Sequence, residues 1–155
     1  MKTWQKILLG GSVAIIGGAI VTSLFLDVYH DAEANAKWNE ALEYCERVGK
    51  PILNAGCGNN PRFVADVNLD KEDSILPNYI KHDLNMALPF GDKQFGAAVA
   101  FHVLEHVEDP KFTLGELNRV ADRLYIVVPH HLGVLYWLTP EHKRMFHYGR
   151  IFSLR

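Results

Sequence analysis

The 155-residue sequence has few cysteines and no concentrated positive charge, and both absences exclude classes of function. Its two cysteines, Cys45 and Cys57, are too few for a disulfide framework and lack the C-x-x-C spacing of a tetrahedral zinc site. Sixteen Lys and Arg residues face 18 Asp and Glu residues without any basic run, so we expect no nucleic-acid partner. What remains is an ordinary globular composition, long enough for one domain.

Charge is also absent from residues 7–26, which are mostly apolar. Twenty helical residues span roughly 30 Å, the thickness of the hydrocarbon core of a bilayer. Trp4 and Tyr29 flank the run, where interfacial aromatic residues belong. We therefore predict a transmembrane helix within residues 1–30 and a single-pass membrane protein that contacts lipid. A buried helix and a cleaved signal peptide are the alternatives. Residues 34–36 have the small-x-small form of a cleavage site, but the apolar run is long for a signal core.

One face of this predicted helix carries small residues at every fourth position. Such a stripe lets a second membrane helix approach closely, although membrane helices contain glycine for other reasons too. A membrane-protein partner would bind here through Gly10, Ala14, Gly18 and Thr22.

Glycine and proline are missing from residues 19–48, and apolar residues recur there at helical spacing until Gly49. We predict an amphipathic linking helix over 31–49, followed by an independent domain over 50–155.

Short apolar segments alternate with helical or loop segments after residue 50, a pattern typical of an α/β domain with a parallel sheet. We expect the order 3-2-1-4-5 in a Rossmann-like three-layer sandwich whose mostly parallel sheet is truncated. The carboxyl ends of the first and fourth strands would then border a ligand crevice. The predicted strands cover 51–55, 63–67, 79–82, 95–101 and 123–128, with a helix over 110–121.

Glycines and acidic residues follow these strands. Glycines let the backbone approach a ligand closely, and a carboxylate at the end of the second strand can accept hydrogen bonds from ribose hydroxyls. We expect one site formed by Asn54, Gly56, Gly58, Asp66, Asp83, Leu84, Phe101 and His102.

Five segments between residues 51 and 129 resemble the class I S-adenosylmethionine-dependent methyltransferases: ILNAGCG, VADVNLD, HDLNMALPF, FGAAVAFHVLEHVEDP and ELNRVADRLYIVVP. The resemblance implies S-adenosylmethionine as cofactor, with its methionine moiety on the 56–58 loop. It implies further that Asp66 binds the ribose, that Asp83 and Leu84 hold the adenine, and that Phe101 and His102 lie beside the sulfonium.

The chain departs from the family pattern at several places. Asn54 stands where an acidic residue is usual, and the stretch between Gly58 and Asp66 has no room for the usual first helix. The sixth and seventh strands of the family are not expected before Arg155, so the fifth strand is expected to be an edge that could pair with another chain.

His102 is the candidate general base, because an unperturbed imidazole pKa of about 6.5 suits proton removal near neutrality. Packing of the crevice wall is the alternative role for this side chain. His102, Glu105 and His106 also fit H-x-x-E-H, a zinc-protease helix pattern, but the first turn of the helix after the fourth strand explains Glu105 and His106 more simply.

Two functions follow from these observations. The first is a membrane-anchored methyltransferase that acts on a small or lipid-like acceptor. The second is a catalytically weak or inactive fold that serves as a structural subunit of a membrane complex. Lys2 and Lys6 before the apolar run favour a cytoplasmic amino terminus, which would export the domain, whereas an enzyme that uses S-adenosylmethionine prefers the cytosolic side.

Overall fold

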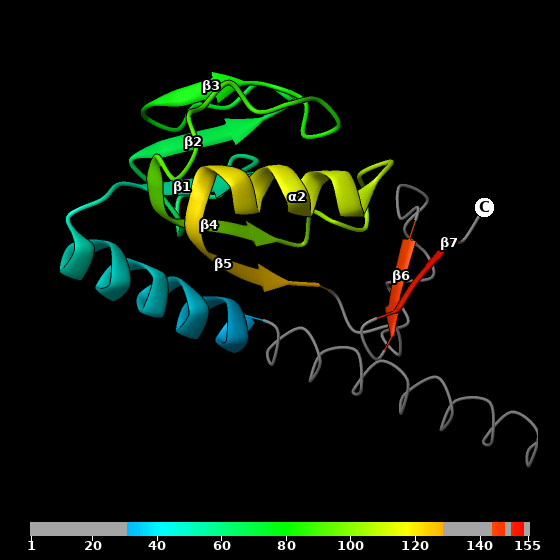
Figure 1. Cartoon of the computed structure of the whole chain (residues 1–155), viewed down its shortest axis with the longest axis horizontal. Coiled ribbons are helices and arrows are strands. Elements are labelled where there is room, and N and C mark those ends of the chain that lie inside the picture. The colour runs from blue at the N-terminus through cyan, green and yellow to red at the C-terminus, as the bar shows by residue number, and fades with distance from the viewer. Residues whose placement is uncertain (1–30, 129–143, 148–149, 154–155) are drawn as a thin grey trace, which may run out of the picture.

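The computed structural model describes residues 31–128, 144–147 and 150–153 (Figure 1). The predicted transmembrane helix over 1–30 and its small-residue stripe lie outside these residues. Within the described part of the chain, no helix has the length and apolar character needed to cross a bilayer.

Five parallel strands form the main sheet, in the order β3-β2-β1-β4-β5, so the predicted order is confirmed. The topology reverses between β1 and β4, which places a switch point at their carboxyl ends. The strands are β1 (Ile52–Ala55), β2 (Val67–Asp70), β3 (Tyr79–Lys81), β4 (Phe95–Phe101) and β5 (Ala121–Val127).

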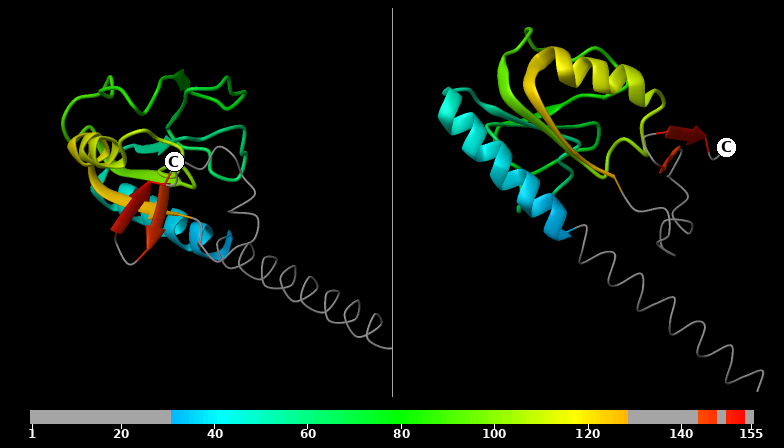
Figure 2. Two further views of the ribbon diagram at one scale, coloured as in Figure 1. Left: turned by 90° about the vertical axis from the view of Figure 1, so that its right-hand side faces the viewer. Right: turned by 60° about the horizontal axis from the view of Figure 1, so that its bottom comes forward.

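Helices cover both faces of this sheet, which makes a three-layer α/β sandwich (Figure 2). Successive side chains of β4 point to opposite faces of the sheet and belong to different core clusters. Ala97 and Val99 pack in the cluster that contains helix 31–48. Ala98 and Ala100 pack in the cluster that contains α2 (Pro110–Val120). Both faces of the central strand are therefore buried, as expected for a parallel sheet with helices on either side.

Helix 31–48 packs as a layer of the domain. Ala34, Trp38, Ala41 and Cys45 are buried at four- or three-residue spacing, which is one face of a helix. The indole of Trp38 lies against Phe63, with ring centroids 5.4 Å apart. The segment that we expected to be a linking helix thus packs into one of the two clusters of the core.

α2 begins where the sequence supplies a cap. The Asp109 carboxylate accepts hydrogen bonds from the backbone N–H groups of Lys111 and Phe112, and Pro110 occupies the first turn, where its missing N–H costs nothing. The helix ends at Val120 and β5 starts at the next residue. β5 therefore begins two residues earlier than the predicted 123, and the carboxylate of Asp122, its second residue, binds the Lys50 ammonium at 2.7 Å.

The second strand was misplaced by the sequence prediction: it covers Val67–Asp70 and not 63–67. Phe63 and Ala65 are buried, but they reach the core from irregular backbone that packs under helix 31–48. The buried Asn68 side chain holds this path by bonding to both the N–H and the C=O of Ala65. The apolar pattern over 63–67 therefore predicted correctly that Phe63 and Ala65 are buried, but it was wrong in predicting that they form a strand.

β5 pairs with β4 and with no other strand in the described part of the chain. Helix 31–48 covers part of its length, since the Lys37 ammonium donates to the Ile126 carbonyl at 2.9 Å. β6 (Arg144–His147) and β7 (Arg150–Ser153), which the sequence analysis did not predict, form a separate antiparallel pair.

Candidate functional site

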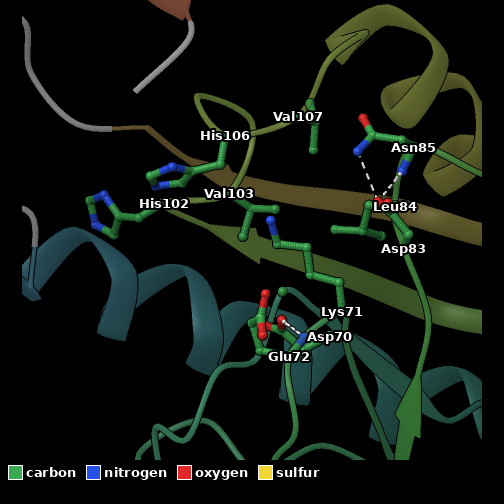
Figure 3. A pocket seen from close by; sticks show the side chains of 11 residues that line it. Asp70, Lys71, Glu72, Asp83, Leu84, Asn85, His102, Val103, His106 and Val107 are labelled. Carbon is green, nitrogen blue, oxygen red and sulfur yellow. Dashed lines mark hydrogen bonds between the residues drawn. The ribbon is translucent and has the colours of Figure 1, made fainter. Parts of the chain in front are cut away.

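A pocket of about 600 Å³ opens at the carboxyl ends of β1, β2, β3 and β4 (Figure 3). His102 and His106 stand at one end of it, Asp83 and Asn85 at the other, and Asp70 between them (Figure 3). The pocket lies at the switch point that the topology predicts. Its lining consists of Gly56, Asp70, Lys71, Glu72, Asp83, Leu84, Asn85, His102, Val103, His106 and Val107.

The glycine loop after β1 forms one wall of the pocket. Gly56 has φ +76°, and a Cβ built there would lie 2.3 Å from a Val103 methyl carbon. Gly58 has φ +51° with open space at its Cβ position, so this second glycine is needed for backbone conformation alone. The Gly56 N–H donates to the Leu69 carbonyl of β2 at 2.7 Å, which ties the loop to the neighbouring strand.

Asp70 is the acidic residue at the end of the second strand, and the prediction of Asp66 for this place is wrong. Because β2 starts later than expected, Asp66 lies before the strand and accepts a hydrogen bond from the Ile52 N–H, at the amino end of β1. Asp70 ends β2 and lines the pocket. Its carboxylate accepts from the Gly58 N–H at 2.8 Å, which joins the acid to the glycine loop.

The loop after β3 supplies Asp83, Leu84 and Asn85, as predicted for the first two. The Asp83 carboxylate accepts hydrogen bonds from both the N–H and the side-chain amide of Asn85. The side-chain oxygen of Asn85, Oδ1, in turn accepts from the Glu108 N–H at 2.7 Å, which links this loop to the one after β4. The Thr113 hydroxyl of α2 also holds this loop, because it donates to the Leu84 carbonyl at 3.1 Å.

Glu116 and Arg119 on α2 hold the rest of the β3–β4 connection. The Glu116 carboxylate accepts from the Leu88 N–H, and the Arg119 guanidinium donates to the Leu88 and Phe90 carbonyls. The two side chains also pair with one another at 2.7 Å, which lowers the pKa of Glu116 to about 2 through the hydrogen bond from Arg119. The acidic end of the pocket is thus fixed to the main helix of that face.

Residues 102–108 form turns and not a helix, which removes the geometry that the zinc-protease pattern requires. His102 adopts φ +56°, an uncommon conformation for a residue with a Cβ, and its N–H donates to the Val127 carbonyl. Nowhere in the described ranges do three His, Cys, Asp or Glu side chains gather in a way that could hold a metal ion.

Glu105 lies beneath the two histidines with its side chain 1 % exposed. One carboxylate oxygen is 3.9 Å from His102 Nδ1 and 3.9 Å from His106 Nε2, beyond hydrogen-bond distance. Neither oxygen forms a hydrogen bond with the described residues. Burial therefore raises the pKa of Glu105 to about 7.

A second, smaller cavity of about 90 Å³ adjoins the pocket and shares Gly56 and His102 with it. Asn54 and Phe101 line this cavity and not the larger one, so the predicted site residues divide between two neighbouring spaces. The Asn54 amide N–H donates to the Phe63 carbonyl at 2.7 Å, and the side chain is nearly fully buried.

The model of the family described as "Methyltransferase domain" matches residues 40–123, more than half of the chain. This chain belongs to the methyltransferase domain family. Members of the family generally use S-adenosylmethionine. A search of the curated proteins found no match.

The structure of this methyltransferase domain brings together most of the predicted site. The main pocket is lined by Gly56, Asp83, Leu84 and His102. Gly58 does not line it, but its N–H donates to the carboxylate of Asp70, which does. The sequence analysis missed Asn85, which adjoins the predicted Asp83 and Leu84, and two further groups of lining residues. One is the Asp70–Glu72 segment, which a correct placement of β2 would have indicated, and the other is Val103, His106 and Val107, which belong to the HVLEHV segment already noted.

Proposed function

We propose that this methyltransferase-like protein binds S-adenosylmethionine in the main pocket and transfers its methyl group to a small or lipid-like acceptor at a membrane. The observation that carries the proposal is the convergence of Gly56, Asp70, Asp83 and His102 on one pocket from four different strand ends. A volume of about 600 Å³ is in the usual range for a pocket that holds a cofactor-sized ligand.

The donor and acceptor groups of the pocket suit an adenosyl ligand. Asp70 Oδ1 and Oδ2 each accept one backbone N–H, from Glu72 and Gly58, and a carboxylate can accept further bonds from two ribose hydroxyls. At the other end, Asp83 Oδ1 is bonded to Asn85, which leaves Oδ2 for the exocyclic amine of adenine. Between them, Leu84, Val103 and Val107 provide apolar surface for the base.

When bound, S-adenosylmethionine would supply a methyl group on a positively charged sulfur. The lone pair of an acceptor would attack the methyl carbon in line as the carbon–sulfur bond breaks, and the sulfur would leave as the neutral thioether of S-adenosylhomocysteine. The contribution of the protein to such a step is mainly orientation in a site closed to water. His102 lies at the end of the pocket opposite Asp83, with its side chain 39 % exposed (Figure 3). In this proposal it accepts the proton that an acceptor hydroxyl or amine loses.

Titration calorimetry with S-adenosylmethionine tests the binding that the function requires. We expect saturable binding by the full-length protein, weakened at least tenfold by Asp70→Asn, which corresponds to about 1.4 kcal/mol. Asp66→Asn is the matched control, because it makes the same chemical change at the amino end of the sheet. An equal loss in both variants, with thermal melts unchanged, would refute the assignment of Asp70.

The second candidate function is a structural subunit of a membrane complex that keeps the fold without efficient catalysis. The position of β5 supports this candidate: among the described strands it pairs with β4 alone, and an edge strand offers its backbone groups to another chain. The same titration separates the two functions: no heat of binding at millimolar S-adenosylmethionine eliminates the enzyme and leaves the subunit.

Anchoring by residues 7–26 is part of both proposals and rests on the uncharged apolar run alone. For the enzyme, a cytosolic domain is favoured, since S-adenosylmethionine is a cytosolic metabolite. Protease digestion of sealed vesicles of known orientation would decide on which side the domain lies.

A further inference from the structure

A smaller cavity lies beside the main pocket and shares two lining residues with it. It measures about 90 Å³ and continues from the main pocket past Gly56 and His102. A ligand with its adenosine between Asp70 and Asp83 would extend its methionine portion in this direction. The residues around this cavity therefore determine how a charged amino-acid end is received.

Asn54 cannot offset the ammonium charge of such an end. Its side chain is neutral, and its amide N–H is used by the Phe63 carbonyl at 2.7 Å. Only 5 % of the residue is exposed, so little of it is accessible from the cavity. A cationic group placed here needs an acidic partner from another element.

Asp31 is the acidic side chain that lines this cavity. It comes from the end of helix 31–48 that lies near the carboxyl ends of the strands (Figure 1). Its Oδ2 accepts a hydrogen bond from Arg62 Nη1 at 3.1 Å, and Oδ1 makes no hydrogen bond with the described residues. One carboxylate oxygen is thus held in place while the other remains able to accept.

Arg62 fixes the position of this carboxylate. Its second terminal nitrogen donates to Asn35 Oδ1 at 3.1 Å, one turn further along the same helix. Its guanidinium carbon lies 5.3 Å from the centroid of the Phe63 ring, whose side chain also lines the cavity. The guanidinium therefore links helix 31–48 to the loop after β1, and Asp31 is held at the junction.

We propose that Asp31 binds the α-ammonium group of the methionine portion of an adenosyl ligand, and that Arg62 is the positioning residue for it. The inference rests on the proposed function, since it assumes that the adenosyl group occupies the main pocket. The acidic group at Asp31 thereby provides the charge that Asn54 lacks. The helix that follows the predicted membrane segment is, on this account, part of the ligand site.

Two ligands distinguish this contact from a general effect on the pocket. S-adenosylhomocysteine and 5′-methylthioadenosine are both uncharged at sulfur and share the adenosine, but only the first has an amino-acid end. We expect Asp31→Asn in the full chain to weaken S-adenosylhomocysteine threefold to tenfold by calorimetry, and to leave 5′-methylthioadenosine within twofold. The modest size follows from the 65 % exposure of the Asp31 side chain.

Glu33→Gln is the matched control, because it removes the same charge from the same helix. Glu33 pairs with Lys37 and does not line either cavity, so this variant should bind both ligands as the wild type does. Equal affinity of Asp31→Asn and wild type for S-adenosylhomocysteine, or an equal loss for both ligands, would overturn the role of Asp31 and leave the proposed function standing. If the wild type bound neither ligand, both the role of Asp31 and the proposed function would be overturned.

Discussion

At the scale of single residues, Gly56 connects the core to the pocket. Its φ of +76° is unfavourable for any residue with a Cβ, and the space that a Cβ would need is occupied by Val103. Val103 lines the pocket, so any relief of this contact moves the pocket wall.

Gly56→Ala is therefore expected to lower the free energy of unfolding by about 2–4 kcal/mol, because backbone strain and displacement of Val103 add. Gly58→Ala is the control, since it meets no neighbour within 4 Å and should cost only about 1 kcal/mol. Urea unfolding of both variants measures the difference. Equal losses would show that the contact with Val103 does not constrain residue 56.

Glu105 makes the stability depend on pH. Burial raises its pKa to about 7 from 4.5, so the folded state holds the proton more tightly than the unfolded state. The stabilisation that this proton gives is complete below pH 4.5 and is lost as the pH rises through 7. The loss is at most about 3 kcal/mol, and protonation of His102 or His106 within 3.9 Å would reduce it.

Glu105→Gln is expected to remove this dependence. The variant should unfold with nearly the same free energy as the wild type at pH 4.5 and with a higher one at pH 8, where the wild type carries a buried charge. Denaturant unfolding across this range provides the test. Parallel curves for the two proteins would mean that the Glu105 carboxyl titrates normally.

At the scale of elements, the strand predictions were correct where a buried run of apolar residues is also extended in the structure. Seven consecutive apolar residues make β4, and its predicted bounds are those of the structure. The prediction of β2 failed because Phe63 and Ala65 are as apolar as strand residues but contact helix 31–48 from a loop. A polar Asn68 in the middle of the true strand, bonded to Ala65, obscured the alternation further.

The same misplacement accounts for the main error in the site. Residues that follow a correctly placed strand, such as Gly56, Asp83 and His102, were found, because parallel strands end at one edge of the sheet. Asp70 was missed because its strand was shifted by a few residues. Asp31 could not be found from sequence, since it meets Arg62 across 31 positions through the packing of a helix that we expected to be a linker.

Trp38→Ala tests whether helix 31–48 is a structural layer. Trp38 is 8 % exposed and packs on Phe63, which in turn meets Phe101 at 5.2 Å. Truncation should cost about 3–5 kcal/mol of unfolding free energy. Phe112→Ala, at a side chain of α2 that is 41 % exposed, serves as control and should cost less than about 1 kcal/mol. Similar small losses in both variants would indicate that helix 31–48 is a linker and not a structural layer.

At the scale of the whole molecule, helix 31–48 follows the predicted membrane segment and packs on the domain that we propose to bind the cofactor. Residues 7–26 carry no charge, whereas helix 31–48 is amphipathic and buries one face on the sheet. A domain held in this way would work close to the bilayer, where lipid-like acceptors are concentrated.

Ile15→Arg together with Ile16→Arg is expected to abolish stable insertion, because each arginine near the centre of a membrane helix costs about 2.5–3.5 kcal/mol. Resistance to extraction from membranes by alkaline carbonate is the measurement. Ile15→Leu with Ile16→Leu keeps the apolar character and should remain resistant. Retention of the arginine variant in the membrane would contradict anchoring through this segment.

We propose that loops distant along the chain form one adenosyl site, and a crystal structure of the full chain with S-adenosylhomocysteine would reveal whether they do. The account predicts ribose hydroxyls at Asp70, the adenine amine at Asp83, and the amino-acid end in the cavity lined by Asn54 and Asp31. A ligand bound outside the pocket of Gly56, Asp70, Asp83 and His102, or no ligand at saturating concentration, would contradict the account.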